Sequence, residues 1–150
     1  MKEISHIIRK AYLDLLKPLT LDSMYVPVFD ERVNPQVQIP TYKGGRCYVL
    51  IRDQNEVETT NSQCTFRKTA SITLDIVTKY PLNLGGKLTS ELISNEIQQK
   101  INTFNQISFE MEGFQVLSTK LEFSRNITEN GDTETAYRKI LGFSHSIYQL

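Results

Sequence analysis

The chain contains two imidazole side chains, His6 and His145, and imidazole is the group that most often acts as a general base in enzymes. His145 stands between Ser144 and Ser146, and a Ser–His pair is the starting arrangement of hydrolytic chemistry. The surrounding residues predict a strand, in which neighbouring side chains point to opposite faces and cannot share the required hydrogen bond. His6 has no second ligand candidate at a metal-binding spacing. We therefore expect neither histidine to catalyse a reaction or to bind a metal.

Glycines and carboxylates offer no clearer chemistry. The glycine pairs at residues 44–45 and 85–86 are isolated, and neither is followed by the lysine and hydroxyl that a phosphate-binding loop needs. The acidic residues are scattered singly, as in solvated faces and turns: Asp30, Glu31, Asp53, Glu56, Glu58, Glu110 and Glu112. We therefore expect no catalytic residue, no cofactor and no metal site.

Two cysteines, Cys47 and Cys64, lack the close pairing of a zinc site and are too few for a disulfide scaffold. We interpret both as reduced thiols of a cytoplasmic environment, and a disulfide between neighbouring strands stays open as the alternative.

Basic and acidic residues balance at 17 each, so the chain has no overall field that would attract DNA or a membrane. A local basic surface could still form when copies assemble, and its candidate members are Arg46, Arg67, Lys68, Arg125, Arg138 and Lys139. The sequence has no run of about 18 apolar residues, so we expect no transmembrane helix. The charged N-terminal residues argue against a secretory signal.

These residues must be positioned by one long strand and one long helix in residues 65–104. In the strand, Ile72, Leu74 and Ile76 alternate with polar residues, which is the pattern of a half-buried strand. Pro81 should end it, and glycines follow. The predicted helix has an apolar stripe of Leu88, Leu92, Ile93, Ile97, Ile101 and Phe104. The predicted solvent-facing side of this helix carries polar residues, namely Ser90, Glu91, Asn95, Glu96, Gln98 and Gln99. We expect Leu74, Ile76, Leu92, Ile97 and Ile101 to be buried.

The remaining elements follow from the same periodicities. Residues 2–17 predict an amphipathic helix that Pro18 ends. The predicted strands are residues 25–29 (an edge strand, because of Pro27), 47–52, 107–111, 114–123 (with Leu117, Leu121 and Phe123 on one face) and 137–148, where Gly142 suggests a bulge. Polar residues 53–63 are either a hairpin tip or the continuation of two exposed strands. Asn130 and Gly131 predict a hairpin turn within residues 126–133.

Residues 30–45 contain two prolines and two glycines and have no lasting period. Such a long connection is either functional or a surface loop that packs on its own domain, and the sequence favours neither. Four of its side chains are apolar, namely Val33, Val37, Ile39 and Tyr42. We predict that this segment is an arm whose apolar residues dock on a neighbouring subunit or ring.

The order of elements does not alternate regularly between helix and strand, which argues against a doubly wound parallel sheet. We predict an α+β fold: a single domain of residues 1–150 with a mostly antiparallel sheet. An N-terminal helix and one central helix should pack on one face, and residues 30–45 and 124–134 should be extended loops.

This order resembles that of the small tail-terminator and tail-completion proteins of tailed bacteriophages. The matching segments are CYVLIR, the strand ASITLDIVTKY, the helix KLTSELISNEIQQKINTF and the last strand TAYRKILGFSHSIYQL. The resemblance covers nearly the whole chain and consists of an order of elements, without a residue signature. It therefore carries over no catalytic residue.

The resemblance implies a virion protein, assembled in the host cytoplasm, that forms a homo-oligomeric ring (a hexamer or dodecamer) at the neck. Its partners would be other neck, connector and tail proteins, with DNA passing non-specifically through the channel and no membrane involved. Residues 30–45 and 126–133 match the places where such proteins extend arms. A head-completion connector role stays open. So does a second interpretation, a small monomeric α+β enzyme or nucleic-acid-processing domain, although no acid/base or metal cluster favours it.

Overall fold

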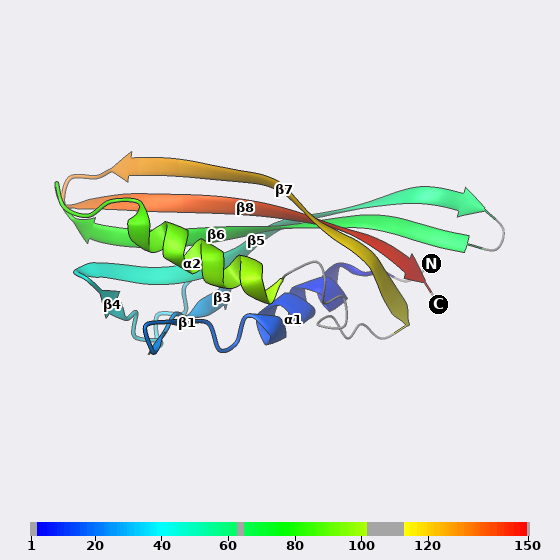
Figure 1. Ribbon diagram of the computed structural model, residues 1–150, viewed down its shortest axis with the longest axis horizontal. Helices are drawn as coiled ribbons and strands as arrows, with labels where there is room; N and C mark the ends of the chain where they lie inside the picture. The colour runs from blue at the N-terminus through cyan, green and yellow to red at the C-terminus, as the bar shows by residue number, and fades with distance from the viewer. Residues whose placement is uncertain (1–2, 63–64, 102–112, 150) are drawn as a thin grey trace.

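The computed structural model describes residues 3–62, 65–101 and 113–149 and places two helices against one long sheet (Figure 1). The helices are α1 (Ser5–Leu15) and α2 (Leu88–Lys100). The strands are β1 (Thr20–Leu21), β2 (Met24–Tyr25), β3 (Val28–Asp30), β4 (Thr41–Tyr42), β5 (Gly45–Ser62), β6 (Thr65–Pro81), β7 (Phe114–Asn130) and β8 (Glu134–Gln149). The predicted α+β class, with an N-terminal and a central helix, is confirmed.

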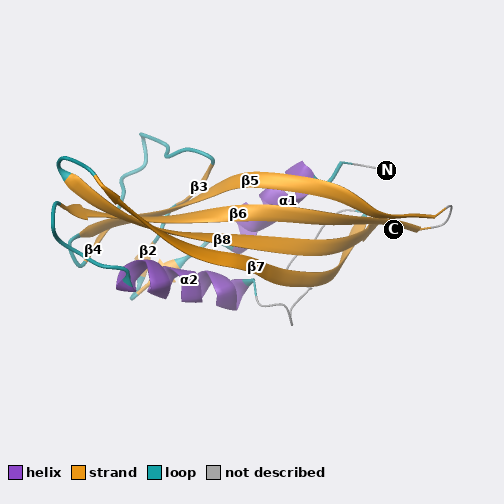
Figure 2. Ribbon diagram, turned by 90° about the horizontal axis from the view of Figure 1, so that it is seen from above, coloured by secondary structure: helices purple, strands orange, loops and turns teal. Residues whose placement is uncertain are grey.

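The sheet has the strand order β3-β5-β6-β8-β7, with β4 added beside β5. β3 runs parallel to β5, and all other neighbours run antiparallel. β1 and β2 form a separate two-stranded ribbon. The long strands run along most of the molecule (Figure 2), and both helices lie on one side of them (Figure 1). We call this side the helix face and the opposite side the open face.

The main core lies between the helices and the helix face. It contains Ile8 and Tyr12 of α1, Ile93 and Ile97 of α2, Ile72, Leu74 and Ile76 of β6, and Leu141, Phe143 and Ile147 of β8. Full burial of one such side chain contributes about 1.5–3 kcal/mol. The predicted burial of Leu74, Ile76, Ile97 and Ile101 is confirmed, whereas Leu92 is only half-buried.

Helix α2 is rotated relative to the predicted stripe. Leu88, expected in the core, is 64% exposed, and Ser90, expected on the wet side, is 1% exposed. The hydroxyls on the buried side are satisfied locally, since Ser90 Oγ donates to the carbonyl of Lys87 and Tyr80 Oη donates to Thr89 Oγ1. Burying them is therefore inexpensive, and their small size lets the helix lie close to the sheet. Phe104 lies outside the described residues.

The turn between β6 and α2 is built around the ring of Tyr80. β6 ends at Pro81, as predicted, because proline cannot donate to the ladder. A Cβ on Gly85, at φ +83°, would lie 2.3 Å from Tyr80 Cγ, and a Cβ on Gly45 would lie 2.5 Å from Tyr80 Cζ. Glycine at both positions lets two separate segments close on this one buried ring.

The strands at the β3 side of the sheet follow the sequence closely. Pro27 separates β2 from β3, and β3 is an edge strand as predicted. The apolar run of residues 47–51 is buried in β5, between β3 and β6. Of the two alternatives for residues 53–63, strand continuation is confirmed up to Ser62, where β5 ends.

The extended loop predicted at residues 124–134 is wrong, because β7 stays paired with β8 up to Asn130. The hairpin prediction is confirmed, with a turn at residues 131–133 that the Gly131 N–H closes by donating to the Glu134 carbonyl. Neither Asn130 nor Gly131 has the positive φ expected of a two-residue turn.

Bulges in β7 reverse one predicted face. The register shifts between Val116 and Ser118 and again between Leu121 and Phe123, so Phe123 lies opposite Gly142 on the open face instead of sharing a face with Leu121. A Cβ on Gly142 would lie 2.3 Å from Phe123 Cε1, so the glycine makes room for the ring. The bulge predicted at Gly142 is therefore on the partner strand.

Three sequence predictions fall outside the described residues or change at their bounds. The strand predicted at residues 107–111 and the second cysteine, Cys64, lie outside the described residues. The helix predicted over residues 2–17 is shorter, since α1 begins at Ser5 and ends at Leu15.

Candidate interaction surfaces

The segment of residues 30–45 folds back on its own sheet. Val33 and Ile39 pack, half-buried, against a cluster on the open face made of Phe29, Tyr48, Leu50 and Val77. Tyr42 is buried in the main core as part of β4, and its hydroxyl donates to Asp22, which raises the Tyr42 pKa. The predicted docking on a neighbouring subunit or ring is therefore wrong for Tyr42, whereas Val33 and Ile39 are half-buried on their own sheet. Val37 remains 41% exposed.

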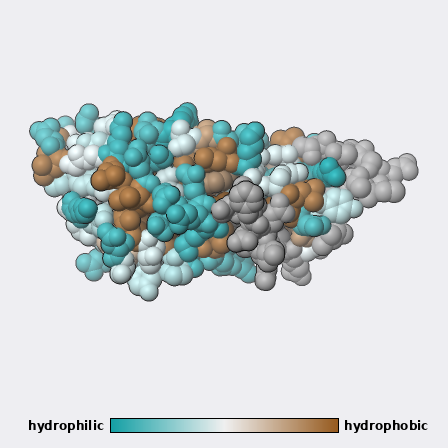
Figure 3. Space-filling view, viewed as in Figure 1, coloured by the Kyte–Doolittle hydropathy of each residue, from teal (hydrophilic) through white to brown (hydrophobic). Residues whose placement is uncertain are grey.

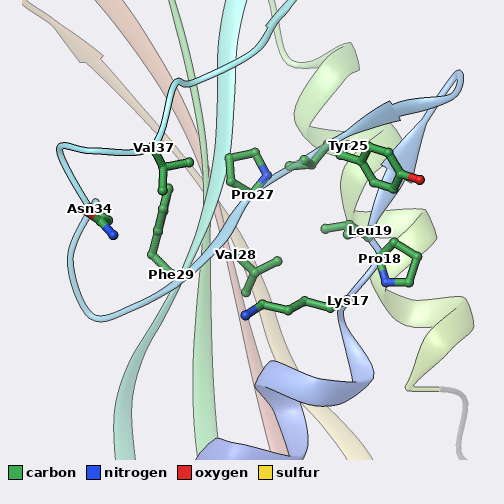
Figure 4. Close-up of a pocket in the computed structure, with 10 residues that line it drawn as sticks. Lys17, Pro18, Leu19, Tyr25, Pro27, Val28, Phe29, Asn34 and Val37 are labelled. Atoms are coloured by element: carbon green, nitrogen blue, oxygen red, sulfur yellow. The ribbon is translucent and has the colours of Figure 1, made fainter.

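Val37 lies at an apolar pocket of about 580 Å³, close in size to sites that hold small ligands or a partner's side chains. Figure 4 shows Val37 and Phe29 on one side of the pocket and Pro18 and Tyr25 on the other. The further lining residues are Lys17, Leu19, Val26, Pro27, Val28 and Asn34. Tyr25 is 69% exposed, so an aromatic ring stands free at the rim.

A second apolar surface surrounds the beginning of α2. Leu82, Leu84 and Leu88 are 44%, 57% and 64% exposed, and we call them the leucine patch. Figure 3 shows apolar side chains gathered over this end of α2. The sequence did not predict this patch, because its helical periodicity places Leu88 in the core. The useful signal was the presence of leucines in a glycine-rich turn, where a solvated loop does not need them.

The six candidate basic residues divide between the two faces of the sheet. By strand register, Lys68 and Lys139 lie on the helix face, and Arg46, Arg67, Arg125 and Arg138 lie on the open face. Lys68 Nζ is 2.9 Å from Glu56 Oε2. Burial raises the Glu56 pKa, but hydrogen bonds from Ser5, Lys68 and the Ile4 N–H outweigh it and lower that pKa. No single basic surface collects all six.

On the open face, Asp75 is a buried carboxylate held by two arginines. Its side chain is 1% exposed, and it forms ion pairs with Arg138 and, at 3.5 Å, with Arg52. Arg138 Nη1 also lies 2.6 Å from Glu129 Oε1, and both carboxylates raise the Arg138 pKa. The cluster joins β5, β6, β8 and β7 laterally. The alternating sequence pattern places Asp75 correctly on the polar face of β6. It predicts a solvent-exposed carboxylate, however, whereas the Asp75 side chain is buried.

A shallow cleft of about 320 Å³ lies beside this cluster, lined also by Asp53, Thr73, Phe123 and Arg125. Arg125 stacks over the Phe123 ring, with its Cζ 5.0 Å from the centroid. The cleft is lined by three guanidinium groups, of Arg52, Arg125 and Arg138, and by the carboxylates of Asp53 and Asp75, so most of its positive charge is compensated. Such a surface can meet a polyanion without holding it tightly.

His145 is a core residue that bridges a helix and a strand. Its Nε2 is 2.5 Å from Tyr12 Oη, and its Nδ1 is 2.9 Å from Thr119 Oγ1. Burial raises the Tyr12 pKa, so the phenol stays protonated and donates to Nε2, which leaves Nδ1–H to donate to Thr119. Burial lowers the His145 pKa to about 4. The neighbouring serines lie on the open face, so the strand argument against a Ser–His pair is confirmed.

The described residues offer few other reactive groups. Cys47 is a buried free thiol, and burial raises its pKa to about 11, which keeps it protonated and unreactive. Among the described residues, no group of three or more His, Cys, Asp or Glu side chains is arranged to hold a metal ion. No helix in this part of the chain is long and apolar enough to cross a membrane.

No protein-family model matches the chain. No curated protein sequence matches it either.

Proposed function

We propose that this protein is a structural subunit of a tailed-phage neck, which assembles into a homo-oligomeric ring of six or twelve copies at the head–tail junction. The ring surrounds a channel through which DNA passes. The subunit acts as a tail terminator, tail-completion protein or head-tail connector, and it contacts other neck and tail proteins.

The observation that carries the proposal is that the chain leaves apolar contact surfaces at separate places around its sheet. The pocket beside Val37 and Tyr25 and the leucine patch lie on different segments. Exposed apolar groups gathered in this way are typical of surfaces that meet other proteins. A ring subunit needs several such surfaces, because it contacts two neighbours and the components above and below it.

The ion pairs of the open face support a role in DNA passage. Arg46 is paired with Glu134 there, and Arg138 with Asp75 and Glu129. A channel lined by paired charges presents few free cations to the phosphates, so DNA can slide through it.

The direct test is the size and shape of the purified protein. Light scattering and sedimentation should show a species of six or twelve copies, and negative-stain electron microscopy should show rings with a central hole. Antibodies against the chain should label the head–tail junction of the corresponding virions. A monomer at every concentration tested, together with unlabelled virions, would overturn the proposal.

A further inference from the structure

We propose that copies of this chain join edge to edge, β7 of one copy pairing antiparallel with the far end of β5 of the next, into one continuous sheet whose open face lines the channel. This inference rests on the proposed ring and specifies how its subunits meet.

The first edge is β7, which is the last strand of the sheet. From Phe123 to Asn130 it pairs with β8 without a bulge, and every residue of this run is exposed. The run contains no proline and no lysine, the residues that commonly block the addition of another strand to an edge. Among the described residues, β8 is the only strand that pairs with β7.

The second edge is the far end of β5. β3 covers β5 only at residues 49–51, and β4 only at residues 45–46. The Arg9 side chain binds the next two backbone carbonyls of β5, because it donates to Ile51 O at 2.9 Å and to Arg52 O. Beyond Arg52, no described strand other than β6 pairs with β5.

Strand direction makes these two edges complementary. β5, β6, β8 and β7 alternate in direction across the sheet, because every neighbouring pair is antiparallel. A second copy in the same orientation therefore presents a β5 that runs antiparallel to β7 of the first. Such a head-to-tail joint repeats from copy to copy and closes into a ring when the rotation allows it.

The side chains beside the joint agree with this pairing. Val57 of β5 is 52% exposed, and Phe123 and Ile127 of β7 are 39% and 37% exposed. By register all three lie on the open face, but Val57 is level with Ser118 of β7, whereas Ile127 is level with Tyr48 of β5. The joint therefore displaces each copy along the strands, a stagger of the kind that closing a sheet into a barrel requires. This displacement brings Val57 of one copy beside the apolar residues of the next. The β5 edge carries Asp53, Glu56 and Glu58, which disfavours pairing with its own copy, whereas the β7 run carries Arg125 and Glu129, and Glu129 is paired with Arg138.

The helices decide which face points inward. Both pack on the helix face and need more room than the single loop of residues 30–45 that packs on the open face, so they belong at the larger radius, as helices do around a strand barrel. The open face, with its paired charges, then lines the channel.

Hydrogen exchange of the assembled protein tests the joint directly. On assembly, about every second amide of residues 123–130 and 53–58 should become protected, because the alternate amides of an edge strand point away from its existing partner. Amides of α2 from Asn95 to Lys100, outside the leucine patch, serve as the control and should change less. Rings that leave both edges unprotected would overturn this inference and leave the ring proposal standing.

Blocked variants test whether the joint is head-to-tail. Ile127→Lys blocks the β7 edge and Val57→Lys blocks the β5 edge, and each should lower the assembled fraction by about tenfold or more. Gln99→Lys, at an exposed residue of α2 outside the leucine patch, is the matched control and should assemble normally. Circular dichroism should show all three variants folded.

Mixing the two blocked variants gives the decisive result. Each retains one free edge, so an equimolar mixture should form a two-copy complex that neither variant forms alone. Dimers of Val57→Lys by itself would indicate β7–β7 pairing and overturn the inference, as would a mixture that stays monomeric. A wild-type chain that is monomeric throughout would instead overturn the proposed ring itself.

Discussion

His145 shows how a single residue can make stability depend on pH. The ring is neutral in the folded protein because burial lowers its pKa from 6.5 to about 4. In the unfolded chain it binds a proton at the higher, ordinary pKa. The free energy of unfolding is therefore highest above about pH 6.5 and falls as the pH drops from there towards 4, by about 3 kcal/mol in total.

We expect His145→Ala to lower stability at pH 7 by roughly 2–4 kcal/mol, since it leaves a cavity and removes the partners of Tyr12 and Thr119. The variant should also lose most of the change in stability between pH 7 and pH 4. His6→Ala is the control: His6 is exposed, and the variant should keep the wild-type pH profile. Urea denaturation at a series of pH values measures both quantities. An unchanged pH profile in His145→Ala would show that other groups cause the acid sensitivity.

Asp75 shows which property of a single residue the sequence can predict and which it cannot. The sequence predicted that it would face away from the core, and its register confirms this. Its burial could not be predicted, because it depends on Arg52 and Arg138 arriving from two other strands. A side chain's face follows from local periodicity, but its solvent exposure depends on residues that are distant in the chain.

At the element scale, residues 30–45 fold back over the open face of their own sheet and do not extend away from the domain. Val33 is half-buried against the cluster of Phe29, Tyr48, Leu50 and Val77, whereas Val37 faces the pocket and solvent. Two valines in one loop therefore have different roles.

This difference gives a matched pair of substitutions. Val33→Ala should lower the free energy of unfolding by about 1 kcal/mol, because it removes partly buried methyl groups from a packed cluster. Val37→Ala should change it by less than about 0.5 kcal/mol, since that side chain is 41% exposed. If the pocket takes part in assembly, Val37→Ala should instead lower the assembled fraction. Chemical denaturation measures the first effect and sedimentation the second. Equal destabilisation by both substitutions would contradict the described packing.

The elements themselves were largely predictable, and the errors have identifiable causes. The β6 strand, its end at Pro81 and the burial of Ile97 follow from period and backbone chemistry. The rotation of α2 could not be predicted from the sequence, because the helix buries Ser90 and Ser94 and exposes Leu88, contrary to their hydropathy. Nor could the sequence show the bulge that moves Phe123 to the open face, because a bulge depends on the partner strand. The apolar contact surfaces were predicted least well, since Val37 alone of the four apolar residues predicted to dock is exposed.

At the scale of the whole molecule, the sheet divides the protein into two chemically different sides. The helix face is closed by α1 and α2, and the open face carries ion pairs between strands. If subunits join through their edges, every copy turns the same side towards the channel. The charge that DNA meets is then set by a few carboxylates of β7 and β8, of which Glu129 and Glu134 are partnered with Arg138 and Arg46.

Neutralising these two carboxylates should make the channel hold DNA. In Glu129→Gln with Glu134→Gln, Arg138 keeps Asp75 but loses one partner, and Arg46 loses its ion pair, so each subunit gains two positive charges on the open face. The assembled variant should bind duplex DNA more tightly than wild type at low salt. Its affinity should also fall more steeply with salt, because more counterions are released for each phosphate neutralised. The control is Glu91→Gln with Glu96→Gln, which makes the same change of charge on α2. Retention of labelled DNA across a salt series measures the effect. An equal gain in both double variants would mean that total charge decides the binding, and no gain in the open-face variant would mean that this face does not line the path of the DNA.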